Sequence, residues 1–443
     1  MRLWPGVVTG MVAAGTLLLL VTPFEGATKK KTTRRAAPPS PKISPAVRAA
    51  SLRKVEDYLE ESTRTFAKPG ALVPVFEQLL RLGSEPNKTP VHILHFGDSH
   101  TAADDWTGGL RDLFKERFGD GGSGFSLAGH PFLGYRRFDA RGGGTSGWQS
   151  QGFRSAAGDG YFGLGGVSIS TERAGESVYI DSECDFLEIE YLQQPGGGEL
   201  ALYDSDQRLE DFSTDGELAP GFVRYQTPPG PHRFTLRTLS SRPVRLFGWV
   251  ADKSAGVTYE ALGINGAEAS VMLRWDENML ATYLQRRSPG LIVLASGTNE
   301  ASDPNWNSES YQAMFSALLQ RLRREAPAAS ILVLGPTDRW YRYRGVLRPL
   351  PGIDYIIAAQ QDACRENACA YWNTRERMGG KGSMRAWVSA GLGQIDYVHF
   401  TSAGYRRLAA VLFGDILQQY QTYKKTRLEI ADPVSHGQAH QDR

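Results

Sequence analysis

The sequence predicts an α/β protein whose parallel sheet is covered by helices on both faces and is interrupted by an all-β module. Two observations lead to this fold class. In residues 46–150 and 256–425, short apolar stretches of strand length alternate with helix-like stretches, and all-apolar strands are typical of parallel sheets buried on both faces. In residues 160–255, apolar and polar residues alternate instead, as in strands that expose one face to solvent.

The first part of the α/β domain is predicted to hold two helices, a strand and a third helix. The strand is a short apolar run that ends at Gly97, and Asp104 or Asp105 is able to cap the helix that follows. A Gly-rich stretch at 119–166 carries few helix signals. The predicted elements are helices at 46–66 and 70–82, a strand at Val91–Phe96 and a helix at about Asp104–Phe118.

The all-β module is predicted from four alternating stretches and the turns between them. Pro and Gly separate the stretches, and short strands with this spacing are typical of a β-sandwich. The alternating stretches are Phe186–Tyr191, Glu199–Tyr203, Arg233–Leu239 and Val244–Val250, and the turn signals are Pro195–Gly198 and Pro228–Pro231.

The second part of the α/β domain returns to alternating strands and helices, and a polar tail at 426–443 follows it. Because the strands are short and wholly apolar, we expect them to extend the same parallel sheet. The predicted strands are Leu291–Ala295, Ile331–Leu334 and Ala368–Trp372, and the predicted helices are Ser308–Glu325, Ile353–Glu366 and Ser402–Tyr420.

Composition and charge exclude several classes of protein. The chain has 443 residues, is 41% hydrophobic and 22% charged, and carries a net charge of +2, which excludes a disordered protein and a coiled coil. Residues 1–54 hold ten basic residues and one acid, Glu25, and therefore account for +9. The rest of the chain carries −7, and such a mildly acidic body argues against nucleic acid as a partner.

The amino terminus is typical of an export signal. Arg2 is followed by the apolar run Val7–Val21, and Gly26 and Ala27 offer small residues for cleavage. The basic residues after this run and Glu25 leave a retained membrane anchor open as the alternative. Residues 28–45 form a basic, Pro-rich linker. We therefore expect an exported protein of the periplasm or cell envelope.

Two stretches carry the residue types of a serine nucleophile and its base. In the first, His95–His100, a strand ends at Gly97 and Ser99 stands before a helix, which places a hydroxyl at the carboxyl end of a parallel sheet. In the second, Asp396 precedes His399 by three residues. An imidazole accepts the proton of a serine hydroxyl near neutral pH, and a carboxylate on its other nitrogen fixes its orientation.

Two further stretches offer donors for a developing oxyanion. Asn299 follows the strand Leu291–Ala295, where its amide is able to donate a hydrogen bond. Gly263 and Gly266 lie in a turn where a bare backbone N–H is able to approach a substrate. Each of these stretches on its own also fits an ordinary turn.

Together, the four stretches resemble the SGNH/GDSL hydrolase superfamily. Gly-Asp-Ser, a Gly turn, Gly-x-Asn-Glu and Asp-x-x-His follow one another in this order, at 97–99, 263–267, 297–300 and 396–399. The resemblance covers about 91–150 and 256–425, and it implies a flavodoxin-like three-layer α/β/α esterase fold.

The resemblance also implies roles for these residues. Ser99 is then the nucleophile and its N–H the first oxyanion donor, Gly266 supplies a second N–H, and Asn299 supplies a side-chain donor. His399 is the base and Asp396 orients it. Gly266 is preferred to Gly263 because it lies in the Asn-Gly-Ala stretch. No metal and no cofactor is expected.

The β module narrows the resemblance to the peptidoglycan O-acetylesterases. These exported bacterial enzymes remove acetyl groups from the 6-hydroxyl of N-acetylmuramic acid, and their inserted module resembles a carbohydrate-binding module. The first block departs from the usual family form because His100 stands where Leu is common. The resemblance implies an acetylated glycan as substrate. A transferase, an esterase for another acetylated polysaccharide and a non-enzymatic wall-binding protein remain as alternatives.

Four other residues carry expectations. His100 is expected to contact substrate or to pack beside the site, and Trp148 to stack on a sugar face or to belong to the core. Cys364 and Cys369 are five residues apart, and an exported protein permits either a disulfide or two buried thiols there.

Overall fold

The computed structural model describes residues 43–61, 66–84, 89–152 and 158–431. The predicted export signal and most of the linker, together with the end of the tail, lie outside these residues. Within them, no helix combines the length and the apolar character needed to cross a membrane. From Ile43 onward the chain forms one compact unit.

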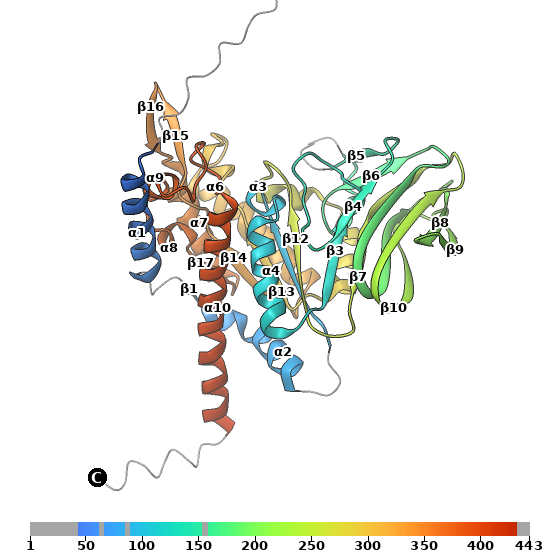
Figure 1. Ribbon diagram of the computed structural model, residues 1–443, viewed down its shortest axis with the longest axis horizontal. Coiled ribbons are helices and arrows are strands. Elements are labelled where there is room, and N and C mark those ends of the chain that lie inside the picture. Colours follow the sequence, from blue (N-terminus) through green and yellow to red (C-terminus); the bar gives the residue numbers. More distant parts are fainter. Residues whose placement is uncertain (1–42, 62–65, 85–88, 153–157, 432–443) are drawn as a thin grey trace, which may run out of the picture. The chain divides into compact units, whose positions relative to one another are not determined.

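The α/β part is built on a six-stranded, mostly parallel sheet, which confirms the predicted fold class (Figure 1). Its central strands pair in parallel, and only β1 runs antiparallel to its neighbour β17. In spatial order the strands are β1 (Phe66–Ala67), β17 (Ala370–Trp372), β14 (Ser330–Leu334), β13 (Leu291–Ala295), β2 (Val91–Gly97) and β12 (Val257–Gly263).

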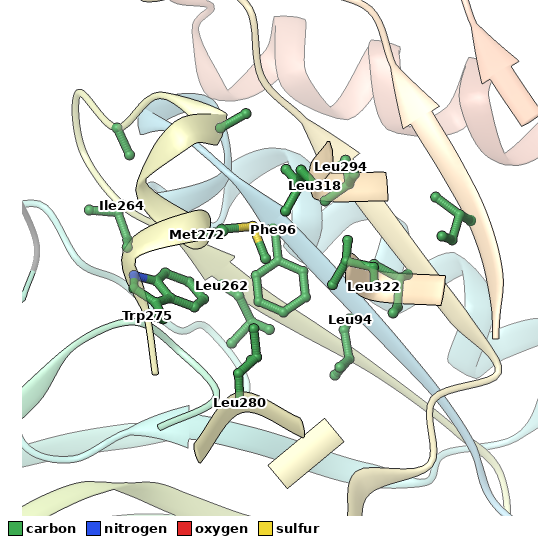
Figure 2. Packing of buried hydrophobic residues seen from close by; sticks show 14 of the residues in the cluster. Leu94, Phe96, Leu262, Ile264, Met272, Trp275, Leu280, Leu294, Leu318 and Leu322 are labelled. Carbon is green, nitrogen blue, oxygen red and sulfur yellow. The ribbon is translucent and has the colours of Figure 1, made fainter. Parts of the chain in front are cut away.

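Helices cover both faces of this sheet because successive residues of each strand point to opposite sides. In β2, Ile93 belongs to one buried cluster and Leu94 and Phe96 to the other. The cluster around Ile93 includes side chains of α2 (Val73–Ser84), α4 (Asp105–Phe118) and α10 (Ser402–Ala431). The cluster around Phe96 includes α5 (Glu277–Arg287), α6 (Ser308–Glu325) and α7 (Gly352–Glu366) (Figure 2).

The remaining elements of the α/β part are helices, 3-10 turns and a hairpin. They are the helices α1 (Pro45–Glu61), α3 (Ser99–Ala102), α8 (Thr374–Arg377) and α9 (Met384–Ser389), the 3-10 turns η1 (Pro69–Leu72), η2 (Ala269–Arg274) and η3 (Glu300–Ser302), and the hairpin of β15 (Trp340–Tyr343) and β16 (Val346–Pro349).

Three local expectations differ from the structure. The helix predicted to reach residue 66 ends at Glu61, and Phe66 lies in strand β1. Asp104 precedes α4 but does not cap it with its side chain; its carboxylate accepts hydrogen bonds from Arg111 at 3.0 and 2.7 Å instead. Helix α10 continues to Ala431, so the first residues of the predicted tail are helical.

The all-β part is a separate antiparallel sheet of nine strands. It begins at Gly122, well before residue 160, because the Gly-rich stretch contributes three strands. The strands are β3 (Gly122–Leu127), β4 (Arg141–Gly144), β5 (Gln149–Gln151), β6 (Ser168–Thr171), β7 (Ser177–Gln193), β8 (Glu199–Asp204), β9 (Gln207–Ser213), β10 (Ala219–Thr238) and β11 (Val244–Asp252).

The long strands β7 and β10 run through both halves of this sheet. The module is therefore one continuous sheet, whereas the sequence predicted the two separate sheets of a sandwich. The first half of β7 pairs with β4, and its second half pairs with β11. Ile180 from the first half and Ile189 from the second nevertheless lie in the same buried cluster. The sheet therefore closes around its own core.

The two sheets also share a core with each other. Phe125, Phe247 and Val250 of the nine-stranded sheet lie in the same buried cluster as Leu280 and Tyr283 of α5. The buried Arg287 at the end of α5 connects the sheets as well. It donates to Asp252 of β11 at 2.5 and 2.9 Å and to Glu260 of β12 at 2.9 and 2.5 Å.

Candidate active site

The structure places Ser99 where β2 ends, as the first residue of α3. The turn before it is tight. A Cβ on Gly97 would collide with the side chain of Thr101 and the carbonyl of Ala295, so only glycine fits there. Asp98 precedes the helix and accepts a hydrogen bond from the His100 N–H at 2.9 Å. The Ser99 N–H belongs to the first turn, where backbone donors lack a partner within the helix.

Ser99, His399 and Asp396 form one chain of contacts. Ser99 Oγ lies 2.8 Å from His399 Nε2, and His399 Nδ1 lies 2.7 Å from Asp396 Oδ2. The second carboxylate oxygen of Asp396 accepts the backbone N–H groups of Val398 at 2.9 Å and of His399 at 3.0 Å. This is the geometry that a serine nucleophile, its base and an orienting carboxylate require.

The hydrogen bonds around Asp396 keep its carboxylate ionised. Partial burial by itself would raise its pKa, but the His399 ring and the two backbone N–H groups stabilise the charged form and lower the pKa to about 2. An ionised Asp396 accepts a hydrogen bond from the Nδ1–H of His399, so that the unprotonated Nε2 faces the serine hydroxyl.

The proposed oxyanion donors lie in the loops after β12 and β13. Gly266 has a φ of 73°, and no hydrogen bond between described residues uses its N–H. Asn299 donates one amide hydrogen to the Ala267 carbonyl at 2.8 Å, which leaves its second amide hydrogen available. Gly263 allows β12 to pack closely against α3, because a Cβ there would collide with the backbone of α3.

Glu300 joins these two loops and was not singled out in the sequence. Its carboxylate is fully buried and accepts the Ala269 N–H with one oxygen and the Gly297 N–H with the other, both at 2.9 Å. Burial raises its pKa to about 7. In the sequence, the only signal that pointed to Glu300 was its position directly after Asn299.

Arg339, which precedes β15, also belongs to the surroundings of the site. It donates to the Thr298 carbonyl at 2.5 Å and to Ser302 Oγ at 3.1 Å. It therefore holds the segment that carries Asn299 from the other side.

The structure does not support substrate contact by His100 or Trp148. His100 is 3% exposed, its Nδ1 lies 2.8 Å from the Tyr405 hydroxyl, and its ring lies 5.1 Å from that of His399. Burial lowers its pKa to about 3, which keeps it neutral. Trp148 packs against the core of the nine-stranded sheet and donates to the Ser177 carbonyl at 3.2 Å. His100 therefore packs beside the site, and Trp148 packs against the core of the nine-stranded sheet.

Two other expectations concern cysteines and metals. Cys364 and Cys369 are joined in a disulfide. Among the residues that the structure describes, no group of three or more His, Cys, Asp or Glu side chains is placed to hold a metal ion.

We expect Asn299→Ala to lower kcat on p-nitrophenyl acetate. One oxyanion donor contributes roughly 10²–10³ in rate, and Asn299 has an amide hydrogen available for this purpose. Asn305→Ala, an exposed residue of the following loop, is the matched control. An unchanged rate for Asn299→Ala in a folded protein would make Asn299 a turn residue only.

Asp98 gives an expected pH dependence of stability. Burial raises its pKa from 3.8 to about 6, against the opposing effect of the His100 N–H. Between these values the native state holds a proton that the unfolded state releases, so the free energy of unfolding falls as the pH rises. Urea unfolding at several pH values should show a smaller decline for Asp98→Asn than for the native protein. Parallel declines would contradict the assignment.

Part of the chain is similar in sequence to a known protein family. Residues 234–407 match the model of the GDSL-like lipase/acylhydrolase family; the matched range contains Gly266, Asn299, Asp396 and His399 but not Ser99. No curated protein sequence matches the chain.

Solved structures give a longer match. A peptidoglycan O-acetylesterase is 26% identical with a TM-score of 0.67, and the match covers 79% of this chain and 96% of that one. Two further solved structures resemble the chain only weakly. A family two carbohydrate esterase from Cellvibrio japonicus is 12% identical with a TM-score of 0.28, and the match covers 64% of this chain and 98% of that one. An acetyl xylan esterase from Geobacillus stearothermophilus is 18% identical with a TM-score of 0.26, and the match covers 36% of this chain and 72% of that one.

Proposed function

Because the chain is a hydrolase of the GDSL/SGNH family, we propose that it is a serine esterase that removes O-acetyl groups from cell-wall polysaccharide. The substrate that we propose is peptidoglycan acetylated at the 6-hydroxyl of N-acetylmuramic acid. The observation that carries the esterase activity is the contact chain Ser99–His399–Asp396, with distances of 2.8 and 2.7 Å.

The first half of the reaction forms an acetyl-enzyme. Ser99 Oγ attacks the acetyl carbonyl carbon while His399 Nε2 takes the hydroxyl proton. The negative charge that develops on the carbonyl oxygen is stabilised by the N–H groups of Ser99 and Gly266 and by the Asn299 amide. When the ester bond breaks, His399 gives this proton to the departing sugar oxygen, which leaves as a hydroxyl group.

The second half releases acetate. A water molecule gives a proton to His399 and attacks the acetyl carbon, and the bond to Ser99 Oγ breaks as the proton passes back to the serine. Asp396 stabilises the imidazolium in both halves because its pKa of about 2 keeps it charged.

Other observations support the glycan as the substrate. The peptidoglycan O-acetylesterase structure is matched over 96% of its length, so the likeness includes more than the catalytic sheet. We also propose export to the periplasm or cell envelope, where such a substrate lies. The disulfide Cys364–Cys369 supports export because disulfides persist in oxidising compartments.

Acetate release from two polymers tests the proposal. The native protein should release more acetate from O-acetylated peptidoglycan than from O-acetylated xylan. A preference for xylan would overturn the peptidoglycan substrate while retaining the esterase. Transfer of the acetyl group to an added sugar acceptor, without release of free acetate when the acceptor is absent, would show a transferase. Wall binding without any acetate release would show a binding protein.

A further inference from the structure

The segment 128–141 follows β3 and ends at Arg141, the first residue of β4, and we call it the 128–141 loop. It touches both elements that position the reacting groups. The Arg136 N–H donates to the Ala102 carbonyl at the end of the Ser99 helix, at 3.2 Å. The side chain of Asn265, the residue before Gly266, donates to the Leu133 carbonyl at 2.9 Å. The loop therefore lies beside the helix that begins with Ser99 and beside the turn that carries Gly266.

Buried polar side chains hold the 128–141 loop in one shape. Arg137 donates to the carbonyls of Ser123 and Phe125 at 2.5 and 2.6 Å and pairs with Asp139 at 2.9 Å. The Phe138 N–H donates to the buried carboxylate of Asp104 at 2.7 Å. The loop is thus fixed from within, and its remaining side chains are not needed for this purpose.

The exposed side chains of the loop are two arginines, a histidine and two large apolar groups. Leu133 is 94% exposed and Phe138 61%, and His130, Arg136 and Arg141 are exposed as well. Exposed large apolar side chains in a rigid loop indicate a binding surface.

The two exposed arginines have no counter-ion of their own. Among the described residues, neither Arg136 nor Arg141 has an ion pair within 4.0 Å. Arg141 lies opposite Asp181 in the pairing of β4 with β7, but Asp181 pairs with Arg233 at 3.5 Å.

A hollow of about 230 Å³ lies between this loop and the nine-stranded sheet. His130, Arg136, Phe138 and Arg141 line it, and none of its lining residues is Asp or Glu. The hollow is therefore positively charged with an apolar side. Ser99 and His399 do not line it; the hollow is linked to the Ser99 helix through Arg136, whose backbone N–H contacts Ala102.

We propose that the 128–141 loop binds a carboxylate-bearing segment of the glycan substrate, next to the ester that Ser99 attacks. This inference rests on the proposed function and adds the part of the substrate that the enzyme recognises. Guanidinium groups bind carboxylates through two parallel hydrogen bonds, and Leu133 and Phe138 offer apolar contact to the rest of the segment. A neutral polymer such as xylan lacks the charged partner.

Binding by the Ser99→Ala protein tests the proposal without turnover of the substrate. The probes are insoluble peptidoglycan, whose peptides carry carboxylates, and insoluble xylan, each measured by co-sedimentation. Adding Arg136→Gln and Arg141→Gln should weaken binding to peptidoglycan about tenfold and leave the weaker binding to xylan much less affected. The difference should shrink in about 1 M salt, where the Debye length is about 3 Å. Adding Arg242→Gln, an exposed arginine away from the hollow, is the matched control, and thermal unfolding checks the fold of each variant.

The outcomes separate this inference from the proposed function. Equal losses on peptidoglycan and xylan, equal losses in the Arg242→Gln control, or no preference of the Ser99→Ala protein for peptidoglycan would each overturn the binding role of the loop. Acetate release by the native protein is measured in parallel. Charge-dependent binding without acetate release would support the loop as a binding site and overturn the proposed esterase.

Discussion

Ser99→Ala should abolish ester hydrolysis while the protein remains folded. Removing the nucleophile of such a triad costs roughly 10³-fold or more in rate. His399 Nε2 would then face a methyl group where it now lies 2.8 Å from Ser99 Oγ, and no acetyl-enzyme would form. The measurement is kcat/KM on p-nitrophenyl acetate, which reports on the catalytic residues without a contribution from polymer binding.

The control for this variant is a serine outside the site. Ser84→Ala, at the exposed end of α2, should retain the native rate. Thermal unfolding of Ser99→Ala should follow that of the native protein. Activity of a folded Ser99→Ala protein within about tenfold of native would remove Ser99 from the mechanism, since triad knock-outs lose far more.

The largest expected loss of stability belongs to Arg287→Ala. Arg287 is 6% exposed and pairs with Asp252 and Glu260, which are 1% and 0% exposed. Without the guanidinium, two buried carboxylates from different sheets would face each other without a positive charge. Removing one partner of a buried ion pair costs about 3–5 kcal/mol, so urea unfolding should show a loss of this size.

Arg324→Ala is the matched control for a buried ion pair. Its partner is Glu277 at 3.3 Å, and their side chains are 64% and 72% exposed. Exposed pairs contribute about 0–1 kcal/mol, so this variant should unfold almost like the native protein. Similar small losses in both variants would show that water reaches the Arg287 cluster.

The positions of the site residues could be predicted because three of the four blocks follow a strand and the fourth, with Asp396 and His399, lies in a loop before a helix. A parallel sheet gathers the carboxyl ends of its strands at one edge, which brings Ser99 and Asn299 to the same side. The helices and strands of the α/β part were likewise visible in the apolar pattern. The catalytic roles themselves remain proposals until the variants are measured.

Other features depend on contacts that the sequence does not show. Strands β3 and β4 are rich in Gly, which has a low strand propensity, and they become strands through pairing with β11 and β7. His100 turns inward because Tyr405, about 300 residues later, offers a hydroxyl. Glu300 acquires its role only when the loops after β12 and β13 meet.

The spacing of these contacts along the chain determines when the enzyme becomes active. Strand β2 completes its pairing only with β13, whose Leu291 pairs with Ile93 about 200 residues earlier, and Ser99 meets His399 only 300 residues later. Synthesis proceeds from the amino terminus, so the nucleophile emerges long before its base. If the proposed roles hold, an unfinished chain carries Ser99 without its base, and we expect no ester hydrolysis before the segment with His399 and α10 has been synthesised.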